Sequence, residues 1–360
     1  MYYWTPLTTI SDGHRRWRLF ALALAVAALL AGPAATAKTL KIATTAPDGS
    51  SWMKVLRKAG DEVDAATEGR VKIKFFPGGV RGDDQQVLRR IRVRQLDGGI
   101  LQTGVFGTLF TDVQIYNLPM LFQSLEEVDA VREVMDPILV AGLADAGFVA
   151  FGIAELGMAY AMSKKEARSL ADARRLKVWS PQGDRPAERT LSAFRIKPIP
   201  LTLSEVLTGL QADLIDTVAA PPVAVLPLQW HRKLKYVLDL PFMYIYSLVV
   251  VTEGSLEGMT ATDVVAVKQI MRTAVAEIDR LNRADHAAAW AALKSQGLQF
   301  LTPTDAEVAQ WRGSAQTATE VWINEGLISR EIHATLMEVL NKARSRQAVR
   351  AVVSPSIAGR

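Results

Sequence analysis

The chain has 360 residues, which is long enough for two domains that each bury a core of their own. Apolar residues make up 49% and charged residues 22%, as in an ordinary globular protein. The formal charge of +5 is spread along the sequence and gives no footprint typical of nucleic-acid binding, so we expect no nucleic-acid partner. Because cysteine is absent, disulfides, thiolate catalysis and cysteine-ligated metal are excluded.

The N-terminal segment has the layout of a secretory signal peptide. A basic run at 15–18 precedes an apolar run, Leu19–Ala31, that is too short to span a bilayer comfortably. The sequence Ala35-Thr36-Ala37 then matches the small-x-small cleavage pattern. We therefore expect residues 1–37 to be a signal peptide, cleaved after Ala37, and the mature protein to lie in the periplasm. An uncleaved anchor is the alternative.

Strand and helix patterns alternate at the start of the mature chain. Apolar and polar residues alternate over 38–44 and 71–76, and a glycine-rich entry leads to a third strand over 97–103. Helices are predicted between these strands, over 52–67 and 83–95. Such alternation is typical of parallel pairing and of an α/β sheet.

The middle of the chain predicts shorter elements. A helix over 125–146, restarted near Pro137, precedes two successive strands, 148–155 and 157–162. Strands over 176–179 and 197–201 then flank a helix over 186–194. The stretch Leu203–Pro222 predicts a helix over 204–212 capped by Ser204, a strand over 214–218 and a proline-bounded loop. This succession is typical of a ligand-lining edge in an open α/β sheet.

The last part of the chain is mostly helical. After strands over 236–240 and 247–252, a helix is predicted over 260–296, capped by Thr260 or Thr262. At about 1.5 Å per residue it spans roughly 50 Å, which is long enough to lie across two lobes. Two more helices are predicted, over 303–325 and 330–348, and we expect residues 350–360 to be frayed.

No linker rich in glycine and serine divides the chain, so two lobes must be joined by strands that cross between them. The crossings are expected near 155–157 and 244–247. Lobe I would then contain residues 38–156 and about 247–285. Lobe II would contain residues 157–246 and about 286–349. The fold class expected is therefore α/β, with two α/β lobes, crossing strands and a long helix that spans both.

Arrangements typical of enzymes are scarce. The four histidines are isolated, so no pair has metal-ligand spacing, and there is neither a G-x-S-x-G motif nor a phosphate-binding Gly-Lys-Ser/Thr loop. We therefore expect no enzyme activity, no metal and no cofactor. The alternative is an exported hydrolase on a bilobal scaffold that uses Glu155 and Asp216.

Features that suit ligand binding are more numerous. The loop 44–52 follows a strand and opens a helix, so its backbone N–H groups and hydroxyls can meet an acceptor on a ligand. It can equally be a plain capping loop, with Asp48 or Ser50 as the N-cap. Several aromatic residues, including Trp230, Phe242 and Tyr246, lie near predicted strand ends. As a set they are typical of an apolar small-molecule cleft.

Six motifs follow one another between about Lys38 and Ala343. They are T-T-A-P-D-G-S-S-W at 44–52, F-F-P-G-G-V-R-G-D-D at 75–84, Y-N-L-P-M-L-F at 116–122, A-R-R-L-K-V-W at 173–179, L-S-E-V-L-T-G-L-Q-A-D-L-I-D at 203–216 and D-L-P-F at 239–242. Their order and spacing resemble the solute-binding proteins of tripartite ATP-independent periplasmic (TRAP) transporters. The resemblance implies a periplasmic solute-binding fold, a cleft between two lobes and hinge closure. It also implies delivery of a small-molecule ligand to TRAP-type permease subunits in the inner membrane. Presentation of the ligand to another kind of partner is a further alternative.

The chain departs from this family at two positions. Many members bind organic acids through an arginine in an L-K-[IV]-R strand and an asparagine in a D-G-x-x-N-P passage. Here Trp179 stands at the arginine position and Ala220 at the asparagine position, so the guanidinium–carboxylate clamp cannot form there. Arg185 and Arg189 are possible substitutes. Because an indole suits a flat apolar face or a cation, we expect an apolar or aromatic ligand, or an atypical organic acid.

Nine residues are expected at the ligand site. They are Thr45, Trp52, Gln85, Thr103, Phe106, Glu155, Trp179, Ala220 and Tyr244. In this prediction Trp179 stacks on the ligand, Gln85 and Thr103 exchange hydrogen bonds with it, and Glu155 takes an amine or a hydroxyl.

Overall fold

The computed structural model describes Met1 and residues 37–353, so residues 2–36 of the predicted signal peptide and residues 354–360 lie outside the described part. The strands are β1 (Lys38–Thr44), β2 (Val71–Phe76), β3 (Gly98–Gln102), β4 (Phe148–Ser163), β5 (Val178–Pro181), β6 (Pro198–Leu201), β7 (Thr217–Ala220), β8 (Tyr236–Thr252) and β9 (Gln299–Leu301). The α-helices are α2 (Ser51–Ala66), α3 (Asp84–Arg92), α4 (Leu125–Asp145), α5 (Leu170–Ala173), α6 (Arg185–Ala193), α7 (Val206–Gln211), α8 (Pro222–Val225), α9 (Ala261–Ser295), α10 (Asp305–Asn324) and α11 (Arg330–Val353). Short 3₁₀ helices are η1 (Thr103–Phe106), η2 (Thr111–Asn117), η3 (Leu203–Glu205), η4 (Trp230–Lys233) and η5 (Glu253–Leu256).

One mixed sheet of nine strands runs through the described part of the molecule. Its order is β2-β1-β3-β8-β4-β7-β5-β6, and β9 pairs with β8. The pairs β1–β2, β1–β3, β5–β6 and β5–β7 are parallel, whereas β8 and β4 run antiparallel to each other and to the strands beside them in that order. The α/β class predicted from the sequence is therefore confirmed.

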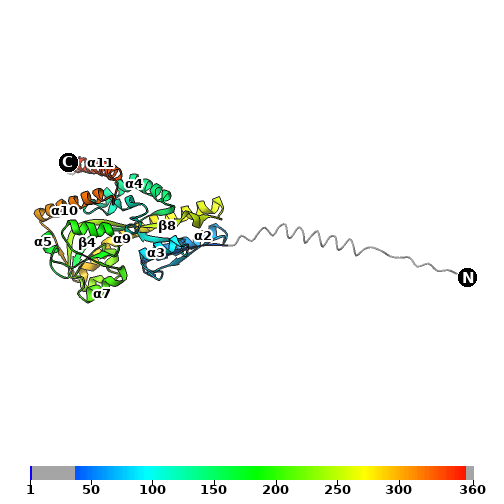
Figure 1. The fold of residues 1–360 in the computed structure, drawn as a ribbon, viewed down its shortest axis with the longest axis horizontal. Coiled ribbons are helices and arrows are strands. Elements are labelled where there is room, and N and C mark those ends of the chain that lie inside the picture. The colour runs from blue at the N-terminus through cyan, green and yellow to red at the C-terminus, as the bar shows by residue number, and fades with distance from the viewer. Residues whose placement is uncertain (2–36, 354–360) are drawn as a thin grey trace, which may run out of the picture.

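The two ends of the sheet form separate groups of elements, which we call the first half and the second half. The first half contains β2, β1 and β3 with α2 and α3, and the second half contains β7, β5 and β6 with α6 and α7. In Figure 1 the first half lies to the right and the second half to the left. In the order of the sheet, β8 and β4 lie between them. Since α9 packs against α2, along β4 and against α8, it joins elements at both ends of the sheet.

Each of the two central strands is longer than the sequence predicted. β4 runs without a break through Gly157, where two strands were expected, and β8 likewise replaces two predicted strands. The pairing shifts register between Glu155 and Gly157, and Gly157 has a φ of +102°. Because glycine adopts such a φ without steric cost, the strand bends there and continues.

The passage after Leu201 also differs from its prediction. Thr202, not Ser204, caps the helical segment, because its hydroxyl and Glu205 form a capping box at the start of η3. The strand begins at Thr217 and not at Leu214, because the Leu214 and Ile215 amides still donate to the Gly209 carbonyl and close the end of α7. Leu214 is accordingly 50% exposed.

The helices follow their predictions more closely. α4 is continuous through Pro137, because its apolar side, including Val131, Met135 and Leu139, is buried on both sides of the proline. Thr260 caps α9 as predicted, by accepting a hydrogen bond from the Asp263 amide at 3.1 Å. The strand β9 was not predicted, and α11 continues to Val353, beyond the expected end. Among the described residues, the helices include none that is both long and apolar enough to cross a membrane.

Candidate ligand-binding site

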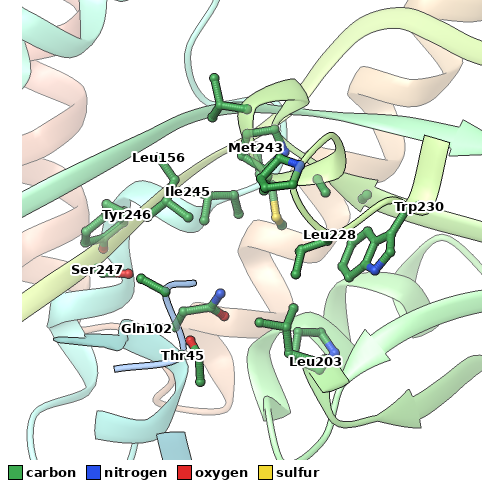
Figure 2. Close-up of a pocket in the computed structure, with 18 of the residues that line it drawn as sticks. Thr45, Gln102, Leu156, Leu203, Leu228, Trp230, Met243, Ile245, Tyr246 and Ser247 are labelled. Atoms are coloured by element: carbon green, nitrogen blue, oxygen red, sulfur yellow. The ribbon is translucent and has the colours of Figure 1, made fainter. Parts of the chain in front are cut away.

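A cavity of about 600 Å³ lies between the two halves. The first half lines it with the loop after β1, the start of α2 and residues of β3. The second half contributes β5, α6 and the segment from β7 to η4, and the central elements β8 and α9 complete the wall. Figure 2 shows Thr45, Gln102 and Ser247 on one side of the cavity, and Leu203, Leu228 and Trp230 on the other. A ligand in this space would contact both halves at once.

The wall from the first half is set by the start of α2. The Ser50 hydroxyl accepts a hydrogen bond from the Met53 amide at 3.4 Å, so Ser50 is the N-cap that the sequence offered as an alternative to Asp48. The loop therefore caps the helix and also lines the cavity. Trp52 lines it too, and its indole N–H donates to Asn282 Oδ1 on α9 at 2.8 Å. This hydrogen bond fixes the plane of the Trp52 ring against the long helix.

Two of the predicted site residues, Trp179 and Ala220, line the cavity from the second half. Trp179 on β5 is only 8% exposed, and its indole N–H donates to the Leu201 carbonyl at 3.0 Å. Its ring meets Trp230 edge to face, with the ring centroids 5.4 Å apart. The indole is therefore held rigidly where the TRAP pattern has a guanidinium.

Thr45, Trp52, Trp179 and Ala220 are brought together on the cavity, and Gln85 lines a smaller cavity of about 60 Å³ beside it. The structure places the other four predicted residues elsewhere. Thr103 is buried and donates to Asn117 Oδ1 at 3.4 Å. Phe106 packs edge to face on Phe148 in the core, with the ring centroids 5.4 Å apart.

Glu155 and Tyr244 belong to a buried charge cluster rather than to the cavity wall. Glu155 is 2% exposed, and its Oε2 accepts hydrogen bonds from the Tyr244 hydroxyl at 3.0 Å and from Arg283 Nη2 at 2.7 Å. Arg132 adds hydrogen bonds to Asp279 Oδ2 at 2.9 Å and to the Tyr244 hydroxyl at 3.2 Å. Desolvation, together with the nearby Glu155 and Asp279 carboxylates, holds the pKa of Tyr244 well above its usual value. Glu155 is thus already satisfied, and a ligand amine has no access to it.

The other expected charged groups are also occupied. Arg185 and Arg189, the candidate substitutes for the family arginine, both pair with Glu325, at 3.1 and 2.8 Å. Asp216 accepts from the Lys177 amide at 2.7 Å and pairs with Lys165 at 3.1 Å. These side chains do not line either cavity.

The charges on the cavity wall are all negative. Asp84, Asp184 and Asp285 line the main cavity, and in the described part of the chain no lysine, arginine or histidine does. Burial raises the pKa of Asp84 to about 6, although the hydrogen bond from the Gln102 amide lowers it. Burial likewise raises the pKa of Asp184 to about 6, against the hydrogen bond from the Ala187 amide. Both carboxyls are therefore mainly ionised at pH 7, and the wall is acidic.

Sequence reasoning missed several lining residues. They include Asp84, Gln102, Ser180, Leu228, Met243 and Ile245. Gln102 and Ser180 lie in strands, where alternate side chains point to opposite faces of the sheet, and this period-two pattern was the available signal. Met243 and Ile245 were hidden by the expectation that β8 is interrupted between 240 and 247.

Residues 42–325 match the bacterial extracellular solute-binding proteins of family 7, which include the TRAP solute receptors. The chain belongs to the TRAP solute-binding protein family. The TRAP solute-binding protein described here is accordingly a receptor and not an enzyme, as the sequence predicted, and the hydrolase alternative with Glu155 and Asp216 is set aside.

Individual relatives of this TRAP solute-binding protein are distant. YiiZ of Salmonella typhimurium is 28% identical over 161 residues, which are 44% of this chain and 49% of YiiZ, so the match spans about half of that protein. The sialic acid-binding periplasmic protein SiaP of Vibrio cholerae is 22% identical over 67% of this chain and 74% of its own. A Bordetella pertussis extracytoplasmic solute receptor that binds pyroglutamic acid superposes with a TM-score of 0.77 at 18% identity, over 85% of this chain and all of that structure. The periplasmic solute-binding fold is thereby confirmed.

Proposed function

We propose that this TRAP solute-binding protein is an extracytoplasmic receptor that captures a small organic ligand between its two halves and delivers it to a TRAP-type permease. The observation that carries the proposal is the cavity of about 600 Å³, to which both halves contribute side chains. Its size lies in the range usual for small-molecule sites, about 300–1,000 Å³. We further propose that export ends with cleavage after Ala37 and leaves the receptor in the periplasm.

The proposal includes hinge closure of two lobes, 38–156 with about 247–285 and 157–246 with about 286–349. The bend of β4 at Gly157 supports this division, because it lies where the chain passes from one proposed lobe to the other. A ligand that contacts both lobes binds the closed form more tightly than the open form, and so selects it.

The nature of the ligand follows from the wall of the cavity. SiaP and the Bordetella receptor bind organic acids, and for this chain an ordinary acid is a poor match, because no cation lines the cavity in the described residues. Instead, its wall includes the aromatic side chains of Trp52, Trp179 and Trp230. We therefore propose a ligand with a substantial apolar or aromatic face.

Native mass spectrometry of the protein, expressed with its own N-terminal segment and purified from the periplasm, tests the proposal. We expect an additional mass from one bound small molecule, and cleavage after Ala37. Protein that stays in the cytoplasm, or that binds no small molecule from periplasmic extract, would contradict it.

The stacking role of Trp179 is tested with Trp179→Phe, against Trp311→Phe as its control. Each tryptophan is buried and donates its indole N–H to one backbone carbonyl, at 3.0 Å for Trp179 and 3.1 Å for Trp311, but only Trp179 lines the cavity. Both variants should lose similar stability, about 1 kcal/mol from the hydrogen bond. Only Trp179→Phe should weaken binding of the recovered ligand, by roughly tenfold in calorimetry, and equal affinities in the two variants would refute the stacking role.

A further inference from the structure

The main cavity contains polar atoms that the protein itself leaves without a partner. Asp84 Oδ1 and Ser180 Oγ are buried, line the cavity and have no hydrogen-bond partner among the described residues. Ser180 is only 1% exposed. Since a buried polar group without a partner costs free energy, such atoms at a binding site indicate where a ligand supplies the missing donor or acceptor.

The free oxygen of Asp84 has a fixed place. Asp84 is the first residue of α3, and its Oδ2 accepts a hydrogen bond from the Gln102 amide at 2.9 Å. This contact ties the carboxylate to the end of β3 and leaves Oδ1, which is buried, without a hydrogen-bond partner among the described residues. A ligand donor at this end of the cavity would supply the partner that Oδ1 lacks.

A second carboxylate, that of Asp184, lines the same cavity from the second half. Asp184 caps α6, and its Oδ1 accepts from the Ala187 amide at 3.0 Å. Asp84 and Asp184 both line the main cavity and also the smaller one of about 60 Å³, whose wall includes Gln85 and Gln102. The two cavities share Thr45, Trp179 and Leu203 as well, so the smaller cavity adjoins the larger one at the two carboxylates.

No described residue with a cationic side chain lines either cavity. We propose that the ligand carries a cationic N–H donor, such as a primary ammonium, which pairs with Asp84 and Asp184, while its apolar body lies against Trp179 and Leu203. An organic acid would place its charge beside two carboxylates, whereas an ammonium forms charge-assisted hydrogen bonds with them. The proposal rests on the receptor function proposed above and names its ligand class.

Three probes with the same phenylethyl body test it: phenethylamine, 2-phenylethanol and 3-phenylpropionate. Titration calorimetry of the wild-type protein at pH 7.5 should give phenethylamine at least a tenfold higher affinity than either of the others. Equal affinities, a reversed order, or no binding of the amine at 10 mM would overturn the proposal. If the alcohol or the acid binds and the amine does not, the receptor function stands and only the ligand class fails.

The variant Asp84→Asn removes the charge and keeps an oxygen for the Gln102 amide. It should weaken phenethylamine binding at least tenfold and leave 2-phenylethanol binding within twofold. Asp305→Asn is the matched control, because Asp305 is also the first residue of its helix, α10, but is exposed and does not line either cavity. Should Asp84→Asn fold poorly, Asp184→Asn tests the same pairing from the second half. Unchanged amine affinity in the variant that folds would overturn the pairing.

Discussion

At the scale of single residues, the cavity is distinguished by what stands at 84, 179 and 220. Trp179 and Ala220 stand where the TRAP pattern has two polar side chains, so the guanidinium–carboxylate clamp of that pattern is absent from the wall of the second half. Asp84 is a partly buried carboxylate, and its Oδ1 has no hydrogen-bond partner among the described residues. Because a buried oxygen without a partner costs free energy, Asp84 lowers the stability of the ligand-free protein.

The burial of the Asp84 carboxyl predicts that the stability of the protein depends on pH. Burial raises the pKa of Asp84 from 3.8 to about 6, so the folded protein holds this proton more tightly than the unfolded chain does. Protonated Asp84 therefore contributes favourably to the free energy of unfolding at low pH. This contribution is lost as the pH rises from about 4 to about 6, and it amounts to up to about 1.4 kcal/mol for each unit of pKa shift.

Urea denaturation of the ligand-free wild type and of Asp84→Asn between pH 4.5 and 7.5 measures this effect. The wild type should lose stability relative to the variant as the pH rises, and the difference should level off above pH 7. A difference that does not change with pH would show that Asp84 titrates as it does in the unfolded chain.

At the scale of elements, ion pairs of Arg283 connect α9 to α4 and β4. Arg283 on α9 reaches both Glu155 on β4 and Asp129 on α4, with contacts of 2.7 and 2.6 Å. Asp279, one turn earlier on α9, accepts from the Glu155 amide at 2.6 Å. The long helix is therefore attached to β4 beside the register shift between Glu155 and Gly157.

Replacing Arg283 by methionine should destabilise the protein by about 2–3 kcal/mol, because it removes the closest cation from a carboxylate that is 2% exposed. Arg280→Met, on the same helix, removes an exposed pair with Glu277 and should cost less than about 0.5 kcal/mol. Chemical denaturation of both variants at pH 7 compares them. Equal losses would mean that the buried cluster contributes no more than a surface ion pair.

The elements that could be predicted from the sequence are those with strong local signals. Thr260, Ser50 and the alternation over 38–44 identify their elements correctly, because caps and periodicity act over a few residues. The continuity of β4 and β8 could not be predicted in this way, since Gly157 and Pro241 signal breaks locally, and long-range pairing between the two strands overrides them.

The same distinction applies to the site. Trp179 and Ala220 were proposed because a family motif fixes their positions, and both line the cavity. Glu155 and Tyr244 have polar groups that could bind a ligand, and they lie near the predicted crossing. In the structure they are instead hydrogen-bonded to Arg283 and Arg132, which are far away in the sequence, and to each other. No local pattern distinguishes a free carboxylate from one that is already paired.

At the scale of the whole molecule, the two halves meet closely at one end of the cavity. A Cβ atom added to Gly104 in η1 of the chain segment after β3 would lie 2.7 Å from Asp184 Oδ2 in the second half. One added to Gly183 would lie 3.4 Å from Gln85 Nε2. The conformation described is therefore one in which the halves are in contact.

Gly104→Ala should hinder this contact and favour the open arrangement of the proposed hinge. We expect the affinity for the ligand recovered from the periplasm to fall about threefold to tenfold, with little change in the midpoint of urea denaturation. Gly107→Ala is the control, since the nearest atom to its added Cβ is Gln114 Nε2 at 3.4 Å, within the same half. Equal affinities of the two variants would argue against closure at this point.

β4, β8 and α9 each run through the border between the proposed lobes, and none of them can be divided there without cutting a strand or a helix. The lobes are consequently not exchangeable modules: a chimaera that joins one lobe to that of a relative would have to re-form three continuous elements at the seam.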